Sequence, residues 1–125
     1  MRLKDLLAKL EIGVDYLSLR KVQSRSVHLA VRNEIFEGLV NSEDSGIMVE
    51  VMVNGQLAYS ASQSMKLEDI LKCALEAKQM AIAAEKFTLA KFSLDERPAT
   101  KGKYQSPDCG GLADFNPKEC SEWLM

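Results

Sequence analysis

The segment from Arg25 to Ser62 alternates apolar and polar residues with few interruptions, and this pattern limits the fold more than any other feature of the chain. A period of two is typical of a β-strand that buries one face and leaves the other in water. Asn54-Gly55 is the strongest hairpin signal, because both residues tolerate the positive φ of a tight turn. The residues before it that form one apolar face are Ile47, Val49, Val51 and Val53. We therefore expect an antiparallel sheet built around Asn54-Gly55.

The same alternation predicts the other strands of the sheet. It runs from Val14 to Val22, resumes after the polar sequence QSRS at Val27, and continues from Ile35 to Val40. Asn33-Glu34 fits a tight turn between two strands, and NSEDSG reads as a polar turn that ends at Gly46. In total we expect four or five antiparallel strands.

Helical spacing appears before and after the predicted sheet. Leucines between Leu3 and Leu10 recur at spacings of three and four, and Gly13 follows. A longer stripe rich in alanine runs from Leu67 to about Phe87, with Ser64 as the expected N-cap. We expect an α+β fold: an antiparallel sheet of four or five strands, with a short amino-terminal helix and a long helix packed on one face, then an extended tail.

After Phe87 the apolar period is lost. Residues 88–125 hold all three prolines of the chain, and their composition is typical of an extended linker. Near the end, Asn116 followed by Pro117 predicts the start of a helix that carries Trp123. We expect a domain over residues 1–87, then a linker and the start of the next helix over residues 88–125, with more chain to follow.

Charge and cysteine usage favour an intracellular protein without a nucleic-acid or membrane partner. The 125 residues include 16 Lys and Arg against 18 Asp and Glu, so the formal net charge is -2, and no general attraction to polyanions follows. No segment has the length of a membrane span or the pattern of a secretory signal. Cys73, Cys109 and Cys120 are widely spaced, which favours free thiols in the cytoplasm.

The sequence carries no complete catalytic or metal-binding motif. A zinc site of the HExxH or HExxxH kind needs two imidazoles, and His28 is the only histidine. Its mid-strand position favours a residue that faces solvent or the rim of the sheet. Cys73 is interpreted as a small core residue of the long helix. A thiol enzyme that pairs His28 with Cys73 or Cys109 stays open as a distant alternative, which no local motif supports.

The outer face of the predicted sheet carries a different signal. Met48 and Met52 alternate with Glu50 on the face opposite Val49 and Val51. Two methionines exposed on one strand indicate a surface that a partner or a second domain covers.

Several short motifs follow one another in a recognisable order. They are Asp15-Tyr16 at the entry to a strand, Arg25-Ser26, Arg32-Asn33 with Glu37, Ser42 with Gly46, and the Asn54-Gly55 hairpin, followed by an alanine-rich helix and the closing DFNPKECSEWLM. In this order the chain resembles the amino-terminal domain of the TldD/PmbA family, over essentially its whole length.

This resemblance implies a function as part of a zinc-dependent peptidase, a family also described as modulators of DNA gyrase. In the family, a D-type subunit with an HExxxH motif pairs with a PmbA-type subunit, and the amino-terminal domain helps to enclose the cavity into which unfolded peptide is fed. The partners that the resemblance implies for this chain are a homologous subunit, in a homo- or heterodimer, and unfolded peptide substrate. The resemblance places the zinc site in a carboxy-terminal part that is absent here. It therefore implies no catalytic residue, no metal ligand and no cofactor in this chain, which should be inactive alone.

Two positions depart from the family pattern. Glu34 stands where the family has a turn glycine, and Gly46-Ile47-Met48-Val49-Glu50 replaces a pattern of glycine, any residue, glycine, a hydrophobic residue and arginine. These changes alter the strand surface and put family contacts there in doubt. The candidate contacts with a partner or a peptide are Arg25, Arg32, Glu37, Met48, Glu50 and Met52. A module that stands alone and binds peptide or protein by strand addition is the alternative function.

Overall fold

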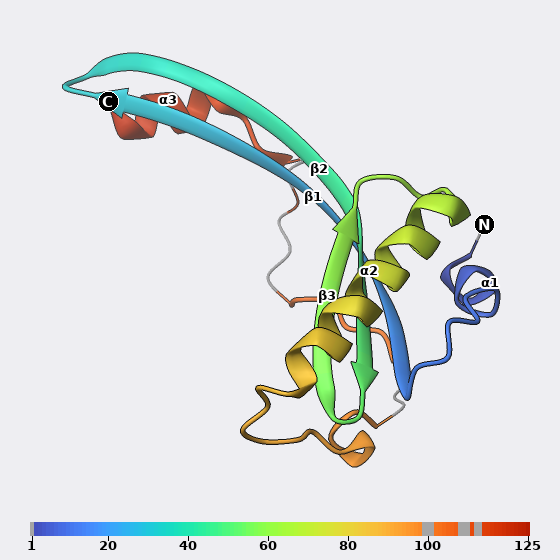
Figure 1. The fold of residues 1–125 in the computed structure, drawn as a ribbon. Helices are drawn as coiled ribbons and strands as arrows, with labels where there is room; N and C mark the ends of the chain where they lie inside the picture. The colour runs from blue at the N-terminus through green and yellow to red at the C-terminus, as the bar shows by residue number, and fades with distance from the viewer. Residues whose placement is uncertain (1, 99–101, 108–110, 112–113) are drawn as a thin grey trace. The chain divides into compact units, whose positions relative to one another are not determined.

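The computed structural model describes residues 2–98, 102–107, 111 and 114–125. Its elements are α1 (Leu3–Leu7), β1 (Tyr16–Arg32), β2 (Ile35–Val53), β3 (Gln56–Ser62), α2 (Leu67–Glu85), the 3-10 turn η1 (Leu94–Glu96) and α3 (Pro117–Leu124) (Figure 1). The chain divides into two compact units. Met1–Gln23 with Ser45–Thr100 form the sheet unit, and Ser24–Asp44 with Lys101–Met125 form the arm unit.

The sheet has three strands in the order β1-β2-β3. The expected four or five strands are not confirmed, because QSRS and NSEDSG do not interrupt the strands. QSRS lies within β1 and NSEDSG within β2. Their composition is typical of turns, but the Asn33-Glu34 turn brings them opposite each other, as the 2.6 Å contact between the hydroxyls of Ser26 and Ser42 shows. Pairing between two strands satisfies backbone groups that a turn would leave to water.

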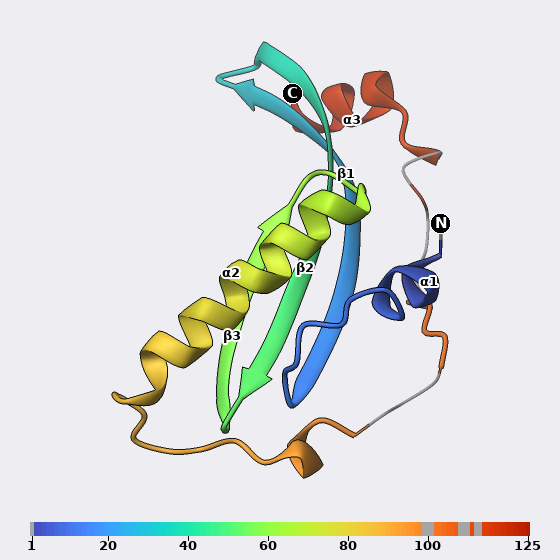
Figure 2. The ribbon, with the colours of Figure 1, turned by 45° about the vertical axis from the view of Figure 1, so that its right-hand side comes forward.

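The core of the sheet unit lies on one face of the sheet. β2 contributes Ile47, Val49 and Val51, all at 1% exposure or less, in the alternation that the sequence predicts. α2 lies along this face of the sheet (Figures 1 and 2). The two helices add Leu6, Ile70, Cys73, Ala74, Ala77 and Ala81 to the same cluster. The α+β class, the short amino-terminal helix and the long helix are confirmed.

Helix ends differ from the prediction in two places. α1 ends at Leu7, yet Leu10 and Ile12 beyond it are still buried in the core cluster. At the start of α2 the N-cap is Lys66, whose backbone N–H donates to Ser64 Oγ, so Ser64 is not the cap but precedes it. Ser64 forms a local turn with its hydroxyl, which competes with capping.

The arm unit contains the far ends of β1 and β2, joined by the Asn33-Glu34 turn, and α3. Asn33 and Glu34 have φ of 50° and 62°, the left-handed backbone that a two-residue hairpin requires. In α3 the Asn116 side chain accepts a hydrogen bond from the backbone N–H of Lys118, and Pro117 occupies the first position, as the sequence predicts. Trp123 on this helix is 88% exposed.

The domain boundary at residue 87 stays a prediction. Beyond it, Thr88 donates a hydrogen bond to the Gln56 side chain and the backbone N–H of Phe92 donates to Gly55 O.

No helix among the described residues has the length and hydropathy of a membrane span.

Substituting the central core residue of α2 should destabilise the sheet unit. We expect Ile70→Ala to lower the free energy of unfolding by about 2–5 kcal/mol, because a fully buried side chain leaves a cavity. Ile82→Ala on the same helix is the matched control, since Ile82 is 50% exposed, and should cost less than about 1 kcal/mol. Urea denaturation followed by circular dichroism measures both, and equal losses would contradict the packing described.

The hairpin turn of the arm should improve when it receives a glycine. A non-glycine residue at the φ of Glu34 is strained by about 1 kcal/mol. We expect Glu34→Gly to raise the hydrogen-exchange protection of the arm amides, and Glu43→Gly, the same replacement at an extended position of β2, to lower it. Reduced protection in Glu34→Gly would show that the turn is not strained.

Candidate functional site

Two motifs that lie far apart in the sequence meet at the Asn54-Gly55 turn. The Asp15 carboxylate accepts a hydrogen bond of 2.7 Å from the backbone N–H of Asn54. The backbone N–H of Asp15 also donates to Met52 O at 3.0 Å. Asp15 therefore attaches the start of β1 to the hairpin between β2 and β3, which gives a structural reason for an acidic residue at this position.

Gly55 in this turn is required for two independent reasons. Its φ is +79°, a region that L side chains rarely adopt. In addition, the segment after α2 passes so close that a Cβ on Gly55 would lie 2.7 Å from the Cβ of Lys91. The backbone N–H of Phe92 donates to Gly55 O at 2.9 Å. The turn is thus the point at which the tail joins the sheet.

Glu50 places a carboxylate on the outer face of β2, where it meets a cation from the tail. Arg97 Nη2 lies 2.8 Å from Glu50 Oε1, and the Glu50 side chain is only 16% exposed. Glu50 Oε1 is buried and accepts no well-aligned hydrogen bond, so the contact is an ion pair. Ser18 Oγ donates to the other oxygen at the long distance of 3.5 Å. The Arg97 guanidinium therefore supplies most of the compensation for this charge.

The neighbouring methionines are less accessible than the sequence suggests. Met52 is 1% exposed and Met48 is partly buried, so the expectation of two exposed methionines is wrong. Met52 lies between Gly55 and Glu50, the two points to which the tail is attached through Phe92 and Arg97. We infer that the tail of the same chain covers this part of the outer face.

The other candidate contacts belong to the arm unit. Arg25, Arg32 and Glu37 are all exposed. Arg32 Nε pairs with Glu37 Oε1 at 3.2 Å, with side chains 74% and 41% exposed, so this pair is well solvated. The six candidates thus divide into three arm residues and three β2 residues of the sheet unit. That these six residues contact a partner or a peptide stays a prediction.

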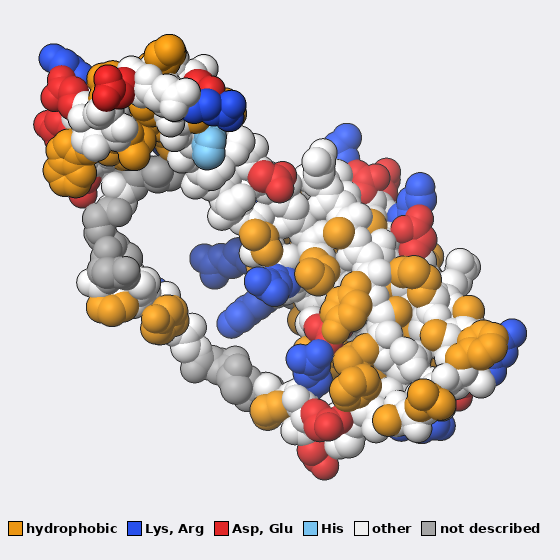
Figure 3. Space-filling view, turned by 90° about the vertical axis from the view of Figure 1, so that its left-hand side faces the viewer, with side chains coloured by type: hydrophobic (Ala, Val, Ile, Leu, Met, Phe, Trp, Pro, Cys, Tyr) orange, Lys and Arg blue, Asp and Glu red, His pale blue; other side chains and the backbone are white. Residues whose placement is uncertain are grey.

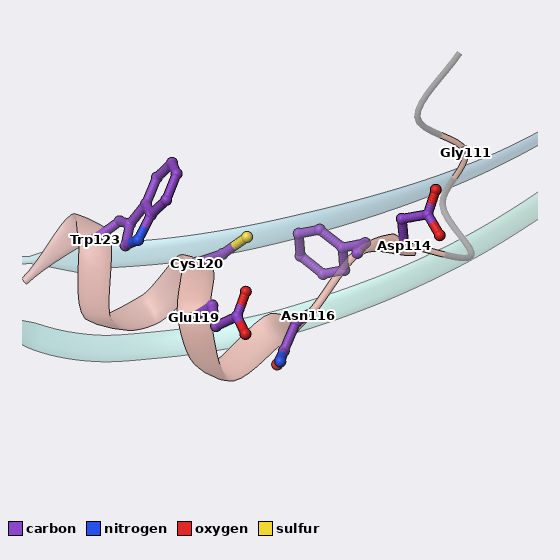
Figure 4. Close-up of a pocket in the computed structure, with 7 residues that line it drawn as sticks. Gly111, Asp114, Asn116, Glu119, Cys120 and Trp123 are labelled. Carbon is purple, nitrogen blue, oxygen red and sulfur yellow. The ribbon is translucent and has the colours of Figure 1, made fainter.

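The arm unit also has an open groove of about 410 Å³ beside α3 (Figure 4). Glu119, Cys120 and Trp123 line it from the helix, and Asp114 and Asn116 from the segment before (Figure 4). Its polar side-chain groups are a thiol, an amide, an indole N–H and two carboxylates, and no base is positioned by a hydrogen bond to the thiol in the described residues. This arrangement lacks the paired nucleophile and base of a thiol hydrolase.

The donor groups of the described residues do not form a zinc site. His28 is its only histidine and lies exposed on β1. Among the described residues, no three His, Cys, Asp or Glu side chains gather closely enough to hold a metal ion. Cys73 is buried in the core, as predicted, and both Cys73 and Cys120 are free thiols. Cys109 lies outside the described residues.

A match to a protein-family model identifies the family of the chain. The family model described as PmbA/TldA metallopeptidase domain 1 matches residues 17–81, just over half of the chain, from β1 through most of α2. The chain belongs to the PmbA/TldD family. This domain is part of a metallopeptidase in that family. No curated protein and no solved structure matches the chain.

Sequence reasoning missed the part that the tail plays in this PmbA/TldD domain. Lys91, Phe92 and Arg97 come from a segment without period, so no local pattern assigns them to the sheet. One signal was available: Glu50 is the one charged residue in the otherwise apolar stretch from Ile47 to Val53, and a half-buried carboxylate requires a counter-ion.

The two ion pairs should differ sharply in a double-mutant cycle. For Glu50 and Arg97 we expect a coupling energy of about 1–3 kcal/mol, measured with Glu50→Gln, Arg97→Met and the double variant. The exposed Arg32 and Glu37 pair, measured in the same way, should give about 0.5 kcal/mol or less. A coupling near zero for Glu50 and Arg97 would mean that the tail does not hold this charge in solution.

Proposed function

We propose that this chain is the non-catalytic amino-terminal domain of a PmbA/TldD-type zinc-dependent peptidase, which helps to enclose unfolded peptide and to assemble the dimer. The observation that carries the proposal is the match to metallopeptidase domain 1 in a chain with a single histidine. A domain of this family without a zinc-binding donor set contributes to the enzyme by shape and contacts.

The apolar surface of the arm supports the part of the proposal that concerns assembly. The exposed apolar side chains near its turn are Ile35 at 68%, Phe36 at 51%, Leu39 at 38% and Val40 at 60% exposure. In Figure 3, hydrophobic side chains lie open to solvent among charged ones on the part that carries the histidine, which is coloured pale blue. Ile35 and Leu39 alternate with Phe36 and Val40 along β2, so both faces of the arm expose apolar side chains. Exposed apolar side chains gathered in a short segment are typical of a protein–protein contact, and the partner here would be a homologous subunit.

The charged candidate residues of the arm support the second part of the proposal, the enclosure of unfolded peptide. Arg25, Arg32 and Glu37 are exposed on the arm with both signs of charge close together. Exposed side chains of both signs complement peptide segments of either charge, which suits an enzyme that receives unfolded chains. Glu50 contributes differently, because its ion pair with Arg97 holds the tail on the sheet.

A specific observation favours the alternative, a module that binds an extended peptide by strand addition. β3 pairs with β2 on one side only, and it is an edge strand of the sheet. Strand addition does not require a catalytic subunit, so this alternative predicts peptide binding by the chain alone.

Assembly should depend on the arm. We expect the purified chain to associate, either with itself or with an HExxxH-bearing subunit of the same family, and Phe36→Asp to weaken this association because it places a charge in the contact. Leu89→Asp is the control, since Leu89 is fully exposed in the sheet unit. Light scattering after size-exclusion chromatography measures both.

The same samples test the assignment of catalysis. The chain alone, with zinc added, should not hydrolyse unfolded casein. Zinc-dependent hydrolysis by the pure chain would refute the non-catalytic role, and failure to associate with itself or with the HExxxH-bearing subunit would refute the role in assembly.

A further inference from the structure

The Asn54-Gly55 turn decides which backbone groups of β3 face outward. It is a two-residue turn, so the flanking pair Val53 and Gln56 exchanges hydrogen bonds, and alternate pairs follow the same pattern. Ala58 and Ser60 therefore bond to β2, while Leu57, Tyr59 and Ala61 direct their N–H and C=O groups away from it. The hydrogen bonds of β2 are consistent with this assignment. Met52, the partner of Leu57, directs its carbonyl away from β3 and accepts a hydrogen bond from the backbone N–H of Asp15, just before β1.

Most of these outward groups of β3 have no hydrogen-bond partner among the described residues. The Leu57 carbonyl accepts a hydrogen bond from the Gln56 side chain. No other backbone or side-chain hydrogen bond of the described residues reaches the outward groups of Tyr59 or Ala61. The strand reads QLAYSAS, with no proline and no charged residue, and its register with β2 has no bulge. Natural edge strands usually carry one of these protections, so β3 is an open template for pairing.

The two faces beside this edge differ in chemistry. Leu57, Tyr59 and Ala61 present apolar side chains on the outer face, and Tyr59 is 47% exposed. On the helix side, Ser60 Oγ donates to the carboxylate of Glu76 at 3.2 Å, which brings an exposed negative charge to the edge. An open groove lined by Glu76, Gln79, Met80 and Ala83 adjoins it on α2.

We propose that the free edge of β3 binds an extended peptide by strand addition, through the backbone groups of Tyr59 and Ala61. Residues of the peptide that hydrogen bond to these groups direct their side chains to the outer face, so they are apolar. The residues between them direct their side chains toward Glu76, so at least one is Lys or Arg. The inference rests on the proposed function for the origin of the peptide, an unfolded substrate, whereas the site itself rests on the strand geometry.

Charge argues against a second copy as the occupant. If two copies paired antiparallel through Tyr59, both Glu76 carboxylates would lie on the helix side near the two-fold axis. Like charges at that distance oppose pairing, whereas a cationic side chain of a peptide complements the same carboxylate.

The decisive experiment uses the full chain and a fluorescein-labelled heptapeptide of alternating lysine and valine, with binding measured by fluorescence anisotropy. The valines are the residues that pair with β3, so N-methylation of every valine should weaken binding about tenfold or more. N-methylation of the lysines alone should leave affinity within about twofold, since their N–H groups face away from β3. Equal effects of the two methylation patterns, or no binding of the parent peptide, would overturn the proposal.

Variants of the protein test the same geometry from the other side. Ala61→Pro removes one outward N–H and should weaken binding about tenfold, while Ala61→Val keeps the N–H and should bind like the wild type. Glu76→Gln should weaken the lysine peptide and leave a threonine–valine heptapeptide unchanged. Circular dichroism confirms that each variant is folded, and the methylation experiment does not depend on any variant.

Two further outcomes separate this proposal from the function proposed above. If light scattering shows a dimer that Ala61→Pro dissociates, β3 pairs with a second copy and the peptide proposal is wrong. If the lysine–valine peptide binds as expected but the chain never associates with itself or with an HExxxH-bearing subunit, the role in assembly fails and the edge site stands.

Discussion

The two-residue turn at Asn54-Gly55 sets the register of β2 against β3, and most other features of the sheet unit depend on this register. With Val53 paired to Gln56, Val49 and Val51 face α2 while Glu50 and Met52 face away. A slip of one residue would exchange these sets and bury a carboxylate against the helix. The turn can hold this register because Gly55 adopts a φ of +79° and leaves room for Lys91. The core, the attachment of the tail and the open edge of β3 are therefore consequences of one turn.

Through its ion pair with Arg97, Glu50 attaches the first part of the tail to the sheet. A carboxylate that is only 16% exposed on a face with two methionines is costly unless a cation compensates it, and Arg97 is the cation in contact. The family pattern that the sequence resembles has an arginine at this position of the strand. In this chain the strand carries the negative charge, and the positive charge comes from the tail. The contact with Arg97 compensates this departure locally, which explains how this strand tolerates Glu50.

The sequence pattern predicted turns, helices and a helix cap that depend on interactions between residues close together in the chain. The Asn54-Gly55 turn, the Asn33-Glu34 turn, the long helix with its buried alanines and the capping of α3 by Asn116 were all readable, because each depends on neighbours in the sequence. The strand count failed because QSRS and NSEDSG resemble turns, and only their pairing across the arm keeps them extended. Glu50 was named from the sequence as a candidate contact with a partner or a peptide, which stays a prediction. Its ion pair with Arg97 was not predicted, because Arg97 lies in a segment without period. Contacts between distant segments leave no periodic trace in one sequence.

The alanines of α2 connect the core to the edge of β3. Ala74, Ala77 and Ala81 are fully buried, and their small side chains allow the helix to approach the sheet closely. This approach is what brings Glu76, on the flank of the same helix, within 3.2 Å of Ser60 on β3. A larger residue in the buried stripe would move the helix outward and withdraw the carboxylate from the edge, even if the sheet stayed intact. The core packing thus determines the charge that an added strand would meet, so the stability of this domain and the selectivity of its open edge cannot vary independently.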